Sequence, residues 1–373
     1  MSNRLMIPVG YFGDFLTRGN VLPFASTAVL AVCGVFSFKR KLRSAHHKAK
    51  LLTYMTPVTH DGQPVDWDDL QFWTRALERR GGWKKASPDE AIDFHLGVGT
   101  EQRGGRIRRY AGPVRKQFHN KQLLFRRLTQ GGVPCIPETC FSSDEFLTAS
   151  QQTPGVVWFF KKAEESRGRG VFPFRQLSDI PASDLAEEGV FQREVPNMML
   201  FPNGCKFDLR VLSFFGPGRQ SHVYDTFFIR TTNAQFQSGN LDREVQCTNL
   251  SLGGTVYPWA GEGQPLPQYE LVRQNIFTAV SQVMVAMRQY LPSDRMHYFG
   301  FDFMLDRDMK PWLLEINSTP HLINSNAAGD VDRMLDDFLE NVLEPQLASQ
   351  TSKYDYTVNP SKWQKVFCDL DVS

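Results

Sequence analysis

The chain has 373 residues, of which 41% are hydrophobic and 22% are charged, and its mean hydropathy is −0.35. These proportions are typical of a soluble globular protein of two or three domains, and they exclude a disordered, collagen-like or multi-span membrane chain. The net charge of +2 is too small for a general binder of nucleic acid. The six cysteines form no C-x-x-C pair, which favours a reducing compartment such as the cytoplasm.

Residues 1–50 are predicted to form an N-terminal extension that contains an apolar segment at 21–38. This segment is uncharged over 18 residues and is followed by Lys39, Arg40 and Lys41. Its length lies at the lower limit for a membrane-spanning helix. Pro23, Ser26, Thr27 and Gly34 dilute its hydrophobicity, so a docked helix or targeting segment is favoured and a membrane anchor is the alternative.

The next segment, 51–112, is predicted to be a small α/β domain. It reads as a strand at 51–55, an amphipathic helix at 66–80 with an acidic start and a basic end, and a second strand at 91–99. This order predicts a β-α-β unit. A loop rich in Gly and Arg follows at 104–113.

Two further domains are predicted, at 113–195 and 196–345, with a tail at 346–373. Helices are expected at 119–132, 271–291 and 331–347, and β-rich segments at 156–162, 170–174, 190–195, 207–215, 223–230 and 297–305. The fold class is therefore α/β (α+β), with mostly antiparallel sheets flanked by helices. The tail contains no recognisable motif.

The segment 300–322, GFDFMLDRDMKPWLLEINSTPHL, predicts a hairpin of two apolar strands. Asp302 on the first strand then lies across from Glu315 and Asn317, which point to one face of the second strand. Two carboxylates and an amide oxygen suit Mg²⁺, which prefers oxygen ligands shared with substrate phosphates. The alternative is a pair of carboxylates at a sheet rim, paired with Lys or Arg; the surrounding apolar frame favours the metal site.

This segment resembles the metal-binding signature of the tubulin tyrosine ligase family, whose members have an ATP-grasp fold. The resemblance extends over about residues 50–322 and rests on six motifs in the family's order: RRGGWKKASPDEAIDFHLG, NKQLLFRRL, FKKAEESRGRGVF, FQREV, KFDLRV and the hairpin. It implies antiparallel nucleotide-binding lobes with ATP and Mg²⁺ as cofactors.

Several residues are expected to bind the nucleotide. In FKKAEESRGRGVF, the glycines allow a loop to fold over phosphates with its N–H groups exposed, and Lys161 supplies a positive charge. Taken alone, the glycines are more typical of an ordinary hairpin loop. The strand VFQREV offers backbone to an adenine edge. With the resemblance, the predicted cofactor-binding residues are Lys121, Lys161, Arg167, Gly168, Gly170, Gln192, Arg193, Glu194, Val195, Lys206 and Asp208.

The resemblance also implies four catalytic residues. Arg210 would face the reacting carboxylate, Arg230 would hold the acceptor or its acyl phosphate, and Thr248 with Asn249 would lie beside the transferring phosphate. The implied chemistry is carboxylate activation: ATP phosphorylates a carboxylate, and an amine then displaces phosphate to form an amide. No nucleophilic side chain is required, which agrees with the absence of a G-x-S-x-G motif.

Four positions depart from the family pattern. Glu164 and Glu165 replace small residues and would disfavour an anionic nucleotide. Gln246 replaces a histidine, and Asp225 stands where a basic residue is common. The last two are expected to affect amino-acid specificity.

The implied function is an ATP-dependent ligase that adds an amino acid, by tyrosination or glutamylation, to the acidic tail of tubulin at the microtubule cytoskeleton. A basic stretch would attract that tail, with a solvated basic face as the alternative. It consists of Arg103, Arg106, Arg108, Arg109, Arg115, Lys116, Lys121, Arg126 and Arg127. Two other functions stay open: a ligase acting on small peptides or free amino acids, and a non-catalytic microtubule-binding module.

Overall fold

The computed structural model describes residues 51–56, 68–87, 89–96, 105–108, 112–165, 168–216, 220–248, 253–263, 265–291, 296–318, 320, 328–349 and 361–368. The chain divides into two units, Met1–Lys48 and Ala49–Ser373, and all described residues belong to the second. The predicted apolar segment at 21–38 lies outside the described residues. In the part of the chain that is described, no helix is long and apolar enough to cross a membrane.

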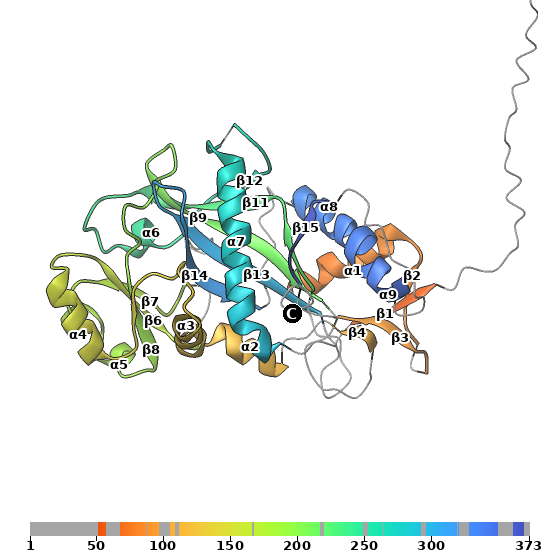
Figure 1. Cartoon of the computed structure of the whole chain (residues 1–373), viewed down its shortest axis with the longest axis horizontal. Helices are drawn as coiled ribbons and strands as arrows, with labels where there is room; N and C mark the ends of the chain where they lie inside the picture. The colour runs from red at the N-terminus through yellow and green to blue at the C-terminus, as the bar shows by residue number, and fades with distance from the viewer. Residues whose placement is uncertain are drawn as a thin grey trace, which may run out of the picture. The chain divides into compact units, whose positions relative to one another are not determined.

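Strands and helices alternate along this unit (Figure 1). In chain order they are β1 (Leu52–Met55), α1 (Asp68–Arg80), β2 (Trp83–Lys85), β3 (Ile92–His95), β4 (Gly105–Arg108), α2 (Gly112–His119), α3 (Lys121–Gln130), β5 (Thr139–Cys140), α4 (Ser143–Gln152), β6 (Trp158–Lys162), β7 (Val171–Phe174), α5 (Ala182–Leu185), β8 (Gly189–Arg193), β9 (Cys205–Phe215), β10 (Gln220–Tyr224), β11 (Phe227–Gln235), α6 (Arg243–Gln246), β12 (Val256–Trp259), α7 (Tyr269–Met287), β13 (His297–Leu305), β14 (Pro311–Asn317), α8 (Ala328–Phe338), α9 (Glu344–Ser349) and β15 (Trp363–Cys368).

The first sheet, which we call the N-terminal sheet, has the parallel order β2-β1-β3-β4. It confirms the predicted β-α-β unit, because the two expected strands, β1 and β3, pair in parallel and α1 lies between them in the chain. Two parts of the prediction differ. The short strand β2 was not expected, since three residues are too few to show periodicity, and the predicted loop at 104–113 contains β4 and the start of α2.

The second sheet, the central sheet, is antiparallel with the order β5-β8-β6-β7. Its apolar face packs on α4 through a cluster of aromatic rings centred on Phe146, which contacts Trp158 at 5.3 Å and Phe191 at 5.5 Å between ring centroids. Helix α3 begins at an N-cap, Asn120, whose side chain accepts a hydrogen bond from the Leu123 amide. The predicted helix at 119–132 is thus α3, preceded by the separate helix α2.

The large sheet is antiparallel and has β9 at its centre. Strand β9 pairs with β10 and β11 on one side and with β13 on the other, and β14 pairs with β13. Helix α7 lies across this sheet (Figure 1), and its buried side chains, among them Ile276 and Val280, share one core with β9 and β13. These antiparallel sheets confirm the predicted α/β class.

The C-terminal part of the chain closes a second core. The sequence predicts a single helix at 331–347. In the structure this region consists of α8, a π-helical turn at Leu339–Leu343 and α9, which follow one another directly. Their apolar face packs on α1, where Trp73 contacts Phe338 at 5.4 Å between ring centroids. Strand β15, in the region predicted as a tail, pairs with β10 and extends the large sheet.

Candidate active site

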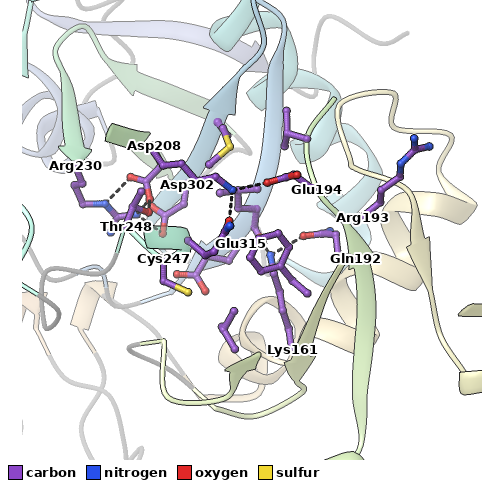
Figure 2. Close-up of a pocket in the computed structure, with 17 residues that line it drawn as sticks. Lys161, Gln192, Arg193, Glu194, Asp208, Arg230, Cys247, Thr248, Asp302 and Glu315 are labelled. Carbon is purple, nitrogen blue, oxygen red and sulfur yellow. Dashed lines mark hydrogen bonds and ion pairs between the residues drawn. The ribbon is translucent and has the colours of Figure 1, made fainter. Parts of the chain in front are cut away.

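A pocket opens where the central sheet meets the large sheet (Figure 2). It is lined by Phe159, Lys161, Val171, Gln192, Arg193, Glu194, Val195, Lys206, Asp208, Arg230, Gln246, Cys247, Thr248, Asp302, Met304, Leu314 and Glu315. The alternation of strand side chains explains this set, because residues two apart on β6, β9 and β13 point to the same face. Eleven of the residues that the sequence analysis selected are in this lining.

Two buried lysines occupy one side of the pocket. Lys161 Nζ donates to Gln192 Oε1 at 2.6 Å, and Lys206 Nζ donates to Glu194 Oε1 at 2.6 Å and to Gln246 Oε1 (Figure 2). Burial lowers the pKa of Lys161 to about 8 and also lowers the pKa of Lys206, with Glu194 opposing the second shift. These ammonium groups are the desolvated cations that an anionic ligand would satisfy.

Paired arginines and aspartates occupy the other side. Arg230 binds Asp208 through two hydrogen bonds of 2.6 and 2.7 Å and also contacts Asp302 at 2.9 Å. Arg210 donates to Asp302 as well, at 3.1 Å from its Nη2. Burial opposes ionisation of Asp302, but the two guanidinium groups hold its pKa well below its usual range. Thr248 adds a hydrogen bond to Asp208.

The hairpin of β13 and β14 brings the proposed metal ligands together. Asp302 pairs directly with Glu315 across the strands, and Asn317 Nδ2 donates to Asp302 Oδ2 and Glu315 Oε1, each at 3.1 Å. Within the described residues, no group of three or more His, Cys, Asp or Glu side chains could hold a metal ion. The donors here are instead two carboxylates and an amide, a set that fits a hard divalent cation whose remaining ligands come from substrate.

None of the other selected residues that the structure describes is in the pocket lining. Lys121 is buried and its Nζ donates to the Glu165 carbonyl oxygen at 2.6 Å, while its pKa is lowered by burial and raised in part by Glu315. Gly168 and Gly170 belong to the loop that joins β6 to β7, between the lining residues Lys161 and Val171. Arg167 and Asn249 lie outside the described residues.

The departures from the family pattern have different outcomes. The carboxylate of Glu164 accepts a hydrogen bond from Asn120 Nδ2 at 2.7 Å and does not line the pocket. Asp225 was expected to affect specificity, but its carboxylate binds Tyr269 at 2.7 Å and Arg273 at 2.8 Å on α7, outside the pocket lining. Gln246 does line the pocket, where it contacts Lys206.

Several lining residues were missed by the sequence analysis. The apolar part of the lining consists of Phe159, Val171, Met304 and Leu314. Cys247 also lines the pocket and lies between Gln246 and Thr248 in the chain. Two of these walls could have been found from strand alternation, since Phe159 is two residues from Lys161 and Met304 is two residues from Asp302. Cys247 carried no signal because a single cysteine in a short loop has no pattern.

Several side chains of the basic stretch make contacts with other parts of the chain. Arg106 pairs with Asp93 at 3.1 Å and with the Leu347 carbonyl oxygen, and Lys121 is buried. Two further guanidinium groups stack on aromatic rings: Arg126 on Phe141 and Arg127 on Tyr290, at 4.5 and 3.6 Å from the ring centroids. The exposed side chain of Lys116 is on α2. Arg103 and Arg109, and the side chains of Arg108 and Arg115, lie outside the described residues.

Comparison with known proteins identifies the family to which the chain is similar. A family model described as the tubulin-tyrosine ligase family matches residues 105–264 and 266–354, which is more than half of the chain. A probable tubulin polyglutamylase TTLL9 of Bos taurus is 25% identical over 336 residues, which cover 67% of this chain and 72% of the relative.

In two other relatives, this chain matches a smaller share of the relative's length. A probable tubulin polyglutamylase TTLL2 of Mus musculus is 28% identical over 289 residues, covering 70% of this chain and 52% of the relative. Tubulin glycylase 3B of Tetrahymena thermophila is 27% identical over 225 residues, covering 53% of this chain and 19% of the relative. The mixed helices and antiparallel sheets agree with the ATP-grasp-like fold of the family. The chain belongs to the tubulin-tyrosine ligase family of ATP-dependent ligases.

Proposed function

We propose that this chain joins an amino acid to a side-chain or terminal carboxylate in the acidic tail of tubulin, with ATP as the energy source and Mg²⁺ as the metal. The observation that carries the proposal is the arrangement of one pocket. Two buried lysines lie on one side, an arginine-aspartate network lies on the other, and the carboxylate pair Asp302 and Glu315 also lines it.

Each group has a task in this chemistry. Lys161 and Lys206 would attract the phosphates, and the segment from Gln192 to Val195 would contact the adenine edge. Asp302, Glu315 and Asn317 would hold Mg²⁺, which supplies charge neutralisation for phosphoryl transfer.

The acceptor side depends on the arginines. Arg230 and Arg210 would orient the acceptor carboxylate and balance the charge that develops while the γ-phosphoryl group moves to it. The P–O bond to ADP breaks and an acyl phosphate forms. The amine of the incoming amino acid then attacks the acyl carbon, phosphate leaves, and the amine loses a proton. Thr248, which contacts Asp208, lies beside this network.

Glutamate is the amino acid that we propose first, because relatives from several animals are named tubulin polyglutamylases. Glycine is the second candidate, since other relatives are named tubulin glycylases. Tyrosine, which the sequence analysis included, is the third. The neutral Gln246 beside Lys206 lines the pocket that would distinguish them.

Mass spectrometry of tubulin tests the proposal. Purified tubulin is incubated with the full chain, ATP and Mg²⁺, and with glutamate, glycine or tyrosine in separate reactions. We expect an ATP-dependent mass increase on tail peptides with glutamate. Turnover of free amino acids without tubulin would support the small-peptide ligase instead, and microtubule binding without ATP binding would support the non-catalytic module.

A substitution at the metal site sharpens this test. Glu315→Gln removes one metal charge with little change in volume, and we expect the ligation rate to fall on the order of 10²-fold. Thermal unfolding of the variant provides the control for folding. Turnover close to that of the parent at saturating Mg²⁺ would contradict the metal assignment.

A further inference from the structure

Two glycines between β6 and β7, Gly168 and Gly170, have closely defined positions just before the lining residue Val171. Gly168 has a φ of 71°, in the left-handed region that favours glycine. A Cβ atom at Gly170 would lie 2.5 Å from Glu165 Cβ and 2.9 Å from Lys162 Cβ. The two flanks of the loop therefore pack closely against each other, and only glycine fits.

The first flank is fixed by the start of α3. The Lys121 amide donates to the Ala163 carbonyl oxygen at 3.0 Å, and Lys121 Nζ donates to the Glu165 carbonyl oxygen at 2.6 Å. Asn120, which is 3% exposed, adds the hydrogen bond to the Glu164 carboxylate. These contacts all come from Asn120 and Lys121 at the start of α3.

The second flank is held by α6. Arg243 Nη2 donates to the carbonyl oxygen of Gly168. Arg243 is the first residue of α6, a short helix that packs against β11 of the large sheet and is followed directly by the lining residues Cys247 and Thr248. One guanidinium group thus connects the glycine-rich loop of the central sheet to the segment that carries Thr248.

That segment is linked in turn to the acceptor side. Thr248 donates to Asp208, and Asp208 is bound by both donors of Arg230. A continuous path of hydrogen bonds and chain connections therefore runs from Gly168 to Arg230. A charged donor gives a stronger hydrogen bond to a carbonyl than a neutral donor does, so loss of Arg243 should weaken the link between Gly168 and the rest of this path.

We propose that Arg243 is a positioning residue that couples nucleotide binding to acceptor binding. It holds Gly168 close to the segment that carries Thr248, which pre-orders the backbone from Gly168 to Gly170 for phosphates and ties its position to Thr248 and the arginine network. The inference rests on the proposed function, because it assigns the loop to phosphates and Arg230 to the acceptor. Pre-ordering lowers the entropy cost of binding, and coupling between two ligands is reciprocal.

Three variants at this position test the inference. Arg243→Ala removes the donor, Arg243→Gln keeps a neutral donor, and Arg243→Lys keeps a charged one. For Arg243→Ala we expect ATP binding to weaken by about tenfold in titration calorimetry, the usual size of one charge-assisted hydrogen bond. Arg243→Lys should restore most of the affinity and Arg243→Gln less.

Coupling is measured on the same proteins. The affinity for a glutamate-rich tail peptide is determined with and without a non-hydrolysable ATP analogue. In the parent, the analogue should increase peptide affinity, and this increase should disappear in Arg243→Ala while peptide affinity without nucleotide stays constant. In steady-state kinetics KM for ATP should rise more than kcat falls.

Two control variants match the test. Glu244→Ala truncates the exposed neighbour on α6, and Arg307→Ala removes an exposed arginine in the turn between β13 and β14. Both should bind ATP as the parent does. If Arg243→Ala binds ATP as tightly as the parent, or if coupling is retained in this variant, the positioning role of Arg243 is overturned. The proposed function is not affected by that result. A parent chain that binds no ATP would overturn the proposed function instead.

Discussion

At the scale of single residues, Lys161 links burial to ligand binding. Its ammonium group contacts Gln192 and the Leu314 carbonyl oxygen but no carboxylate within hydrogen-bond distance among the described contacts. Burial lowers its pKa to about 8, so the charge that would attract phosphate is lost at moderately alkaline pH.

We therefore predict that ATP affinity falls as pH rises through about 8, and that Lys161→Met both weakens binding and removes most of this dependence. The stability of the ligand-free protein should change in the opposite sense. Between the folded pKa of about 8 and the ordinary value of 10.5, the unfolded chain holds more protons, so the contribution of Lys161 to stability rises with pH. Titration calorimetry across this range checks the first statement. An equally steep decline in the variant would contradict it.

Glu164 shows how a departure from a family pattern can be explained by its own partner. Its carboxylate accepts from Asn120, the residue that caps α3. We predict that Glu164→Ala lowers the free energy of unfolding by about 1 kcal/mol, because the Asn120 amide loses its acceptor. Glu164→Gln keeps an acceptor oxygen and should cost less. Urea unfolding of both variants is the measurement, and equal losses in the two would show that the hydrogen bond is unimportant.

At the scale of elements, β15 completes the edge of the large sheet. Trp363 is 4% exposed, and its ring packs against Tyr224 at 5.1 Å and Phe338 at 5.4 Å between centroids. Its Nε1 donates to the Met334 carbonyl oxygen at 3.3 Å. A single side chain on β15 therefore contacts both the sheet and α8.

We predict that Trp363→Ala lowers the free energy of unfolding by about 3–5 kcal/mol, the range for a large aromatic residue in a core. Lys365→Ala, at an exposed position on the same strand, is the matched control and should change stability little. Thermal or urea unfolding measures both. A loss below about 1 kcal/mol for Trp363→Ala would mean that β15 is dispensable for the fold.

At the scale of the whole unit, a row of ion pairs joins α1 of the N-terminal sheet to the C-terminal helices. We call it the ion-pair strip. Its pairs are Arg75 with Asp332 (2.9 Å), Arg79 with Asp332 (3.4 Å) and Asp336 (2.8 Å), and Arg80 with Glu340 (3.1 Å) and Glu344 (2.9 Å). The strip borders the buried contact of Trp73 with Phe338, so packing supplies most of the stability and the charges fix the orientation.

We predict that Arg79→Glu destabilises the protein at low salt and that the second substitution Asp336→Arg recovers part of the loss. Each exposed pair contributes about 0.2–1 kcal/mol, and its contribution should shrink at about 1 M salt, where charges are screened within about 3 Å. Urea unfolding of the double-mutant cycle measures the coupling. Lys85→Glu, at an exposed position on β2, is the control, and a coupling energy of zero at low salt would contradict the role of the strip.

The local features of this protein were determined by its sequence. A composition rich in β-branched and aromatic residues identified β6, β8, β9 and β13, and the helical spacing of apolar residues identified α1, α3 and α7, because both signals depend only on neighbours along the chain. The opposition of Asp302 and Glu315 also followed from sequence, since a short hairpin fixes its own register.

Only the tertiary structure decided which distant groups meet. The contacts of Asp208 with Arg230, of Arg243 with Gly168 and of Asp225 with Arg273 join segments whose separation along the chain contains no information about distance in space. The basic stretch illustrates the same limit, because a run of positive charges looks continuous in sequence. In the fold, Lys121 is buried and Arg106 is paired with Asp93, since each side chain follows the direction of its own element. Burial and pairing across the fold, rather than residue type, therefore determine which of these charges can meet a ligand.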